Sequence, residues 1–353
     1  MKIINLILCT ALAAALLTQP QQVAAGAASG WSLCIDLLLP SLFPFMALAS
    51  FFARTGAGEL ITRPLLPLTR RLGLADCTPS VLISSFIGGY PSGTQAILSY
   101  LDAGQLDRRS ASRLLCCSVN AGPAFVVIAV GERMFFSRTL GWRLLAAQIL
   151  ASLLLCLLFC RSDSLPKTPA RRQGEPFCSA LVESVAQAAR GFAAIGSYVV
   201  LISVLLELLL PLPLSPLPRT LLTGLLEVTT GCAVAASLGG KAGALLAAFF
   251  LSFGGCCVGF QILALLHRSG VPTRGFFFSR ILSGLLGTLL LLPMLPALSA
   301  PVHRPVLLLL TAELFPAANS PNRLLGAACI IAMSAFLFAR IDRCTNRMRR
   351  KPG

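Results

Sequence analysis

The chain has 353 residues, of which 56% are hydrophobic and 12% are charged, and its mean hydropathy is +0.81. This composition excludes an ordinary soluble domain and predicts an all-α protein that crosses a membrane several times. The net charge of +16 does not indicate a nucleic-acid-binding protein, because arginine and lysine stand at the ends of apolar segments, for example from Arg54 to Arg71 and from Arg161 to Arg172. Cytoplasmic loops of membrane proteins have this distribution, and such loops also contact anionic lipids of the bilayer.

The N-terminal segment, residues 1–29, contains Lys2 followed by an apolar stretch. We expect a retained transmembrane helix with its N-terminus in the cytoplasm, although a cleaved signal peptide has the same pattern. The next apolar segment, residues 31–53, is long enough to span a membrane. Its two prolines, Pro40 and Pro44, predict a kink.

Residues 78–101 form an apolar segment that glycine, proline and polar side chains interrupt. Arginine-rich loops flank it on both sides, so we expect it to enter and leave the membrane on the cytoplasmic side as a re-entrant hairpin. Helix breaks expose backbone groups that can bind a ligand. Helix packing on a glycine-rich face is the alternative explanation. The candidate binding residues near the expected tip are Gly88, Gly89, Pro91, Gly93, Thr94 and Gln95.

The next apolar segment is interrupted at residues 120–123. An asparagine inside a membrane requires hydrogen-bond partners, and a Gly-Pro pair opens the helix. Asn120, Gly122 and Pro123 are therefore candidate binding residues, and a kinked packing helix is the alternative. Residues 161–176 are polar and form the expected cytoplasmic linker between two halves of the chain.

In the second half, residues 192–210 are expected to span outward, and the uncharged, proline-rich residues 211–218 are expected outside. The following apolar segment contains Glu227, Thr229 and Thr230. A carboxylate is energetically costly inside a membrane, which makes these three residues candidates for a functional site. A hydrogen-bonded or protonated glutamate at a helix end is the alternative.

Residues 251–270 resemble the first interrupted segment. Shared positions separated by a constant 166 residues indicate an internal duplication, and paired interrupted segments are typical of transporter binding sites. The two copies are inverted if residues 211–218 lie outside the cell, but the basic residues after the second copy argue against this. Cys256 and Cys257 replace Tyr90 and Pro91 in the second copy, so the two tips differ. The matching positions are Gly88, Gly89, Gly93, Gln95 and Gly104 in the first copy and Gly254, Gly255, Gly259, Gln261 and Gly270 in the second. The candidate binding residues from the second copy are Gly254, Gly255, Gly259 and Gln261.

The chemistry of an enzyme is not evident in the sequence. Adjacent cysteines such as Cys116 and Cys117 point apart in a helix and cannot share one metal ion, so the 13 cysteines are expected to be small packing residues. Two histidines form no ligand motif, and no nucleophile elbow or nucleotide-binding loop is present. We therefore expect no catalytic residue, no metal and no cofactor.

Four sequence strings together resemble the YlbJ family of sporulation integral membrane proteins. They are LPSLFPF at residues 39–45, GGYPSG at 88–93, NAGP at 120–123 and LLEVTTG at 225–231. The resemblance implies the nucleoside-recognition or gate domain of several transporter families and a spore-forming bacterial source. It also implies a role in cortex formation, in the mother-cell or forespore membrane, and movement of an unidentified small solute.

Together these features predict an all-α polytopic membrane protein with about eight to ten hydrophobic segments and two gate-type repeats, each with a re-entrant or broken helical hairpin. The expected function is that of a secondary carrier or gated permease, coupled to Na+ or H+, and a non-transporting scaffold for sporulation is the alternative. The sequence leaves open whether the protein forms a homo-oligomer. The expected parts are an N-terminal helix (1–29), two repeats (30–160 and 177–300) joined by the linker, C-terminal hydrophobic segments (301–342) and a basic cytoplasmic tail (343–353).

Overall fold

The computed structural model describes residue 10 and residues 13–56, 61–161, 175–209, 215–267 and 269–295. Every secondary-structure element in these ranges is a helix, and five helical runs are long and apolar enough to cross a membrane. These runs are Pro20–Thr55, Arg138–Phe159, Phe177–Leu209, Gly240–Leu266 and Phe276–Met294. The prediction of a polytopic all-α membrane protein is therefore confirmed. The expected C-terminal hydrophobic segments and basic tail lie outside the described residues.

The first run is continuous over 36 residues, in which α2 (Pro20–Ser32), the π-helix η1 (Leu33–Leu38) and α3 (Leu39–Thr55) follow one another. The boundary expected after residue 29 is therefore not a helix end. The π-helix ends two residues before Pro40, which cannot donate a backbone hydrogen bond, and Pro44 lies inside α3. The helix is thus distorted where the prolines predict a kink.

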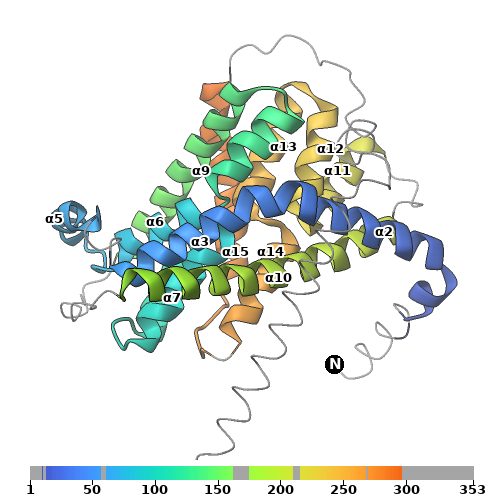
Figure 1. Ribbon diagram of the computed structural model, residues 1–353. Coiled ribbons are helices and arrows are strands. Elements are labelled where there is room, and N and C mark those ends of the chain that lie inside the picture. Colours follow the sequence, from blue (N-terminus) through green and yellow to red (C-terminus); the bar gives the residue numbers. More distant parts are fainter. Residues whose placement is uncertain are drawn as a thin grey trace, which may run out of the picture.

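Helix α10 (Phe177–Leu209) packs along this run in the antiparallel direction (Figure 1). A Cβ atom added at Gly26 would lie 2.7 Å from Val204 Cα, and one added at Gly30 would lie 2.8 Å from Val200 Cα. The two backbones approach this closely because both positions lack a side chain. Residues 177–191 and the predicted span that begins at residue 192 belong to this one 33-residue helix.

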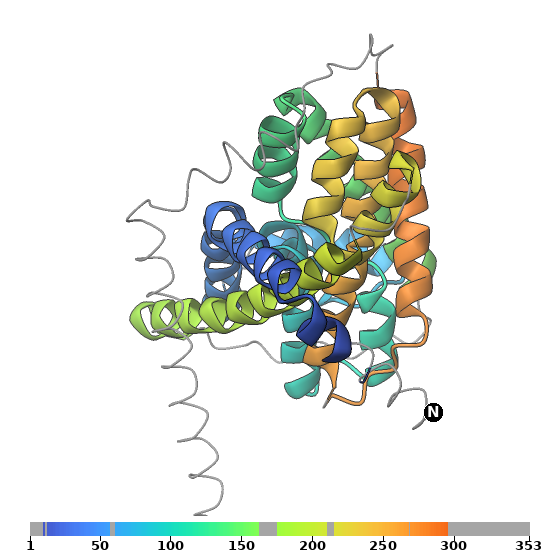
Figure 2. The ribbon, with the colours of Figure 1, turned by 90° about the vertical axis from the view of Figure 1, so that its right-hand side faces the viewer.

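Three further helices, α9 (Arg138–Phe159), α13 (Gly240–Phe253) and α15 (Phe276–Leu291), pack against one another as a bundle. The pair formed by α2–α3 and α10 crosses this bundle, and α10 reaches beyond it (Figures 1 and 2).

Four interruptions fall within the apolar segments that the sequence predicts. Gly89 separates α6 (Thr78–Gly88) from α7 (Tyr90–Asp102), and residues 116–123 separate α8 (Arg108–Leu115) from the π-helix η3 (Ala124–Met134). Glu227 separates α11 (Pro216–Leu226) from α12 (Val228–Leu238). Gly254 separates α13 from α14 (Gly255–Leu266). Three of these interruptions lie in the predicted segments around Gly89, Asn120 and Gly254. The fourth, at Glu227, falls inside a segment for which no break was predicted.

The two segments related by sequence similarity differ in their packing. Helix α6 packs along α7, and α11 packs along α12, so both of these pairs are hairpins. Helices α13 and α14 do not pack side by side and together form a 27-residue run, so the hairpin expected at residues 251–270 is not formed. The backbone explains the difference, because Gly89 has φ +82° and ψ −167°, whereas Gly254 has the left-handed helical values φ +91° and ψ −11°. The internal duplication stays a prediction from the sequence.

Candidate functional site

Three of the interrupted elements surround a central cavity of about 30 Å³. This volume can hold about one or two water molecules or a small ion, but not a larger solute. Apolar side chains from α3, η3 and α10, among them Met46, Phe125 and Val199, form one part of the wall. The interrupted elements form the rest of the wall. They contribute Gly88, Tyr90 and Pro91 from α6–α7, Glu227, Val228 and Thr229 from the start of α12, and Cys257, Val258 and Gln261 from α14.

The interruptions touch one another through glycine. A Cβ atom added at Gly89 would lie 3.5 Å from the backbone nitrogen of Gly122, and one added at Gly255 would lie 3.2 Å from the Leu226 carbonyl oxygen. Gly89 also has a backbone conformation that is essentially restricted to glycine. The structure therefore places Gly89 against Gly122, and Gly255 against Leu226, as backbone contacts rather than as ligands.

Glu227 is the acidic group of the central cavity, and only 1% of it is exposed. Its Oε1 accepts a hydrogen bond from the Thr229 backbone N–H at 2.9 Å, and its Oε2 accepts one from Thr230 at 2.6 Å. Glu227 is thus the N-cap of α12, which is the alternative that the sequence left open. No ion pair to Glu227 is present within the described residues. Two N–H groups and the positive end of the helix dipole compensate its charge.

Asn120 is buried and uses its amide to hold the second interruption in place. Its Nδ2 atom donates to Ser85 Oγ at 3.0 Å, to the Cys117 carbonyl at 3.0 Å and to Ser152 Oγ at 3.2 Å. In addition, Gln148 Nε2 on α9 donates to the Ala121 carbonyl at 3.0 Å. These bonds attach the opened backbone to α6 and α9, so the amide group of Asn120 is engaged within the protein rather than facing the cavity.

Arg280 on α15 is a buried cation that the sequence analysis did not single out, and only 3% of it is exposed. Its guanidinium donates to the carbonyls of Cys116 and Val119, each at 2.5 Å, and to the Ser252 carbonyl at 3.4 Å. These carbonyls are free of helical partners because α8 and α13 end there. An arginine within an apolar segment was the available signal, because a charge in such a position is costly unless it has a partner.

A second, polar pocket of about 150 Å³ lies between α3, α6, α7 and α10. Gln187 Nε2 donates to Gln95 Oε1 at 3.3 Å, and Ser50 Oγ donates to Gln187 Oε1 at 2.8 Å. Gln95 therefore lines a different cavity from Gln261, and the two predicted amides do not meet at one site. The polar lining consists of Ser50, Arg54, Ser84, Ser92, Gln95, Ser99, Glu175 and Gln187.

The other predicted binding residues lie in helix contacts, at a helix end or in the buried core. A Cβ atom at Gly93 would collide with the Ser118 carbonyl, and one at Gly259 would lie 3.1 Å from the Phe277 ring. Both are therefore packing glycines, as the alternative explanation proposed. Pro123 is the N-cap residue of η3. Thr94 is fully buried, and its hydroxyl has no hydrogen-bond partner among the described residues.

Comparison with known proteins gives one informative match. No family model and no solved structure matches the chain. Over 321 residues the chain is 24% identical to the "Sporulation integral membrane protein YlbJ" of Bacillus subtilis (strain 168), and the match covers 77% of this chain and 78% of the relative. The five candidate spans agree with the integral membrane location that this relative's name states. The chain is therefore similar to a YlbJ sporulation integral membrane protein over most of its length, and it is a multi-pass membrane protein.

Proposed function

We propose that this protein acts in the membrane during endospore formation as a secondary carrier or gated permease for a small polar solute. The role in sporulation rests on the similarity to YlbJ. The carrier role rests chiefly on Glu227, a buried carboxylate without an ion pair in the described residues that faces a cavity between broken helices. A carboxylate that meets no cation of the described protein in this cavity is available to H+ or Na+, and on this basis Glu227 is the coupling group of the proposed carrier.

The two cavities suggest separate roles. The polar pocket, at about 150 Å³, is large enough for part of a small solute, whereas the central cavity of about 30 Å³ holds only an ion or water. The first turn of α7 separates them, because Ser92 lines the polar pocket and Pro91 lines the central cavity. A movement at Gly89 would change this wall, and alternating exposure of a site by such a movement is how secondary carriers work.

The test is uptake by the purified protein in liposomes, with labelled nucleosides, amino acids and cell-wall precursors, each with and without H+ or Na+ gradients. Glu227→Gln is expected to abolish gradient-driven uptake, because the amide is neutral, while the retained Oε1 still caps α12. Glu132→Gln is the matched control, since Glu132 is exposed and lines neither cavity. Circular dichroism would show that both variants keep their helices.

Two outcomes would contradict the proposal at different levels. Uptake that is unchanged in Glu227→Gln would remove this residue as the coupling group. The absence of uptake for the whole panel by the unmodified protein would contradict the carrier role and favour a non-transporting scaffold.

The scaffold alternative is favoured by the basic surface of α8. Arg108 and Arg109 are exposed there, and the preceding Asp107 caps the helix through the backbone N–H groups of Arg109 and Ser110. Hydrogen bonding with Ser110 keeps the pKa of the Asp107 carboxyl below its ordinary value, so the cap stays ionised at neutral pH. For a scaffold, charge reversal at Arg108 and Arg109 should impair sporulation, whereas substitution of Gln95 should be silent.

A further inference from the structure

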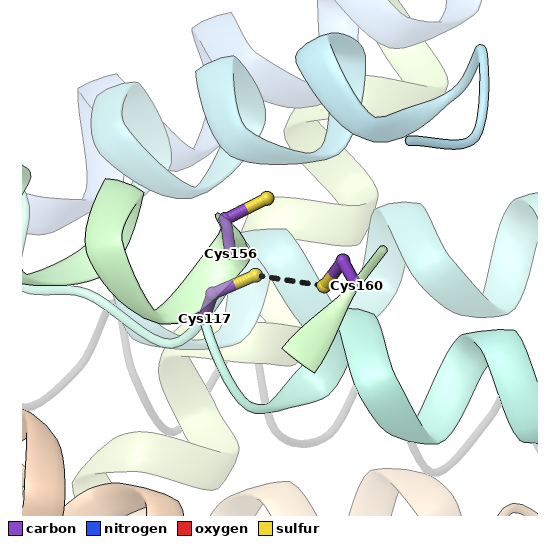
Figure 3. A group of neighbouring side chains, drawn as sticks. All are labelled: Cys117, Cys156 and Cys160. Carbon is purple, nitrogen blue, oxygen red and sulfur yellow. Dashed lines mark hydrogen bonds between the residues drawn. The ribbon is translucent and has the colours of Figure 1, made fainter. Parts of the chain in front are cut away.

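We propose that Cys117, Cys156 and Cys160 bind one thiophilic d10 metal ion of the class of Zn2+ and Cu+. Cys117 follows the end of α8, and Cys156 and Cys160 are one helical turn apart at the end of α9. Figure 3 shows the three thiols gathered at one point from these two parts of the chain. Their exposed fractions are 0%, 2% and 7%, respectively.

The sulfur positions match the requirements of a thiolate metal site. All three sulfur atoms lie within 4.8 Å of one another, and Cys117 Sγ and Cys160 Sγ are 3.6 Å apart. Zinc–sulfur bonds of about 2.3 Å in tetrahedral geometry place the sulfur atoms about 3.8 Å from one another. One pair therefore already has the required spacing, and the others need movements of at most about 1 Å. Three soft sulfur ligands without carboxylate or imidazole select Zn2+ or Cu+ over Mg2+ or Ca2+.

The surroundings of the thiols favour a cation. Cys160 Sγ donates to the Arg113 carbonyl at 3.4 Å, and Cys117 Sγ donates to the Leu114 carbonyl at 3.3 Å. Both carbonyls belong to the last turn of α8, and Cys160 follows the last turn of α9. The negative ends of two helices therefore meet at the cluster. Metal binding forms up to three metal–sulfur bonds and releases the same number of thiol protons to solvent.

Arg280 offsets the negative charge that the thiolates would bring into the protein. Its guanidinium donates to the carbonyls of Cys116 and Val119, which flank Cys117 in the sequence. A buried positive charge beside the cluster reduces the unfavourable energy of placing a thiolate–metal complex in a low-dielectric interior.

The cluster contains only one member of an adjacent cysteine pair, Cys117. Cys116 and Cys117 cannot hold one ion together, but the fold joins Cys117 to two cysteines that follow it by 39 and 43 residues. The Cys117 carbonyl also accepts hydrogen bonds from Asn120 and Ser152. A bound metal would therefore tie α9 to the beginning of the interruption at residues 116–123, which touches Gly89.

The first test is metal binding by the full chain, purified in detergent with chelator and then titrated with Cd2+ as a spectroscopic probe, followed by Zn2+ and Cu+ in competition. The unmodified protein is expected to bind one equivalent with a thiolate-to-metal charge-transfer band. Substitution of Cys117, Cys156 and Cys160 together by serine is expected to weaken binding by roughly two orders of magnitude or more. The matched control is serine at Cys77, Cys178 and Cys232, which removes the same number of thiols from other places. Equal binding by both triple variants would overturn the proposal.

The second test uses only the unmodified protein, so it does not depend on the folding of a variant. Alkylation of the thiols is followed by peptide mass spectrometry with and without one equivalent of Cd2+. The metal is expected to slow modification of the three clustered cysteines together and to leave Cys232 unchanged. Equal rates with and without metal, or isolation of the protein with a Cys117–Cys160 disulfide that excludes the ion, would overturn the proposal. Neither result bears on solute uptake.

Discussion

The two hairpins, α6–α7 and α11–α12, reverse the chain by different physical means. The turn of each hairpin follows an 11-residue helix. Gly89 forms the first turn with φ +82°, whereas Glu227 forms the second in an extended conformation with φ −140° and ψ 123°. The first break depends on the absence of a side chain, and the second on a carboxylate that caps the next helix. Only the second break brings a charge into the central cavity. A membrane protein can therefore open a helix with or without adding a charge.

The breaks at Gly89 and Glu227 also differ in the interactions that constrain them. A Cβ atom at Gly89 would be in ordinary van der Waals contact with the backbone of Gly122, so the first break requires glycine because of its positive φ rather than for lack of space. Glu227 is held by two hydrogen bonds to the first turn of α12. The first break should therefore be sensitive to an added methyl group, and the second to a change of charge.

The largest effect on stability is expected for Arg280→Met, which removes the link between the ends of α8 and α13. Three buried carbonyls would lose their donor, and the free energy of unfolding should fall by about 3 kcal/mol or more. Unfolding in detergent, followed by circular dichroism, measures this loss. Arg274→Met is the control because Arg274 is exposed just before α15. Equal stability of the two variants would show that the breaks do not depend on the guanidinium.

An intermediate effect on stability is expected for Gly89→Ala, which tests only the break between α6 and α7. Alanine disfavours the backbone conformation of Gly89, and the free energy of unfolding should fall by about 1–3 kcal/mol. Gly275→Ala is the control, because Gly275 has φ −83° and open space around its Cα. If both alanine variants were as stable as the unmodified protein, the break would not require glycine.

The smallest effect is expected for Tyr90→Phe, which tests the contact between the first hairpin and α13. The Tyr90 hydroxyl donates to the Leu251 carbonyl at 2.8 Å, and its loss should lower the free energy of unfolding by about 1 kcal/mol. Tyr198→Phe on α10 provides the comparison in the same unfolding measurement. A loss much larger than this would mean that the hydroxyl also positions the cavity wall.

The sequence predicted three interruptions because glycine, proline and asparagine mark helix breaks within apolar segments. It did not predict the hairpin at Glu227, because residues 221–238 read as one apolar segment and a capping glutamate is not distinguishable there from a buried ligand. The predicted duplication gives Gln95 and Gln261 equivalent positions, but the two side chains line different cavities. Local similarity could not show this, because α6–α7 folds back and α13–α14 does not.

The sequence by itself determined that the protein is helical and embedded in a membrane, because composition and the length of apolar segments depend only on local hydrophobicity. It also located most of the breaks, since these follow from residues that cannot continue a helix. Only the tertiary structure decided which breaks meet, that Arg280 serves two of them, and that three distant cysteines adjoin. Such contacts join residues far apart in the chain, and packing between helices, rather than any local pattern, selects them.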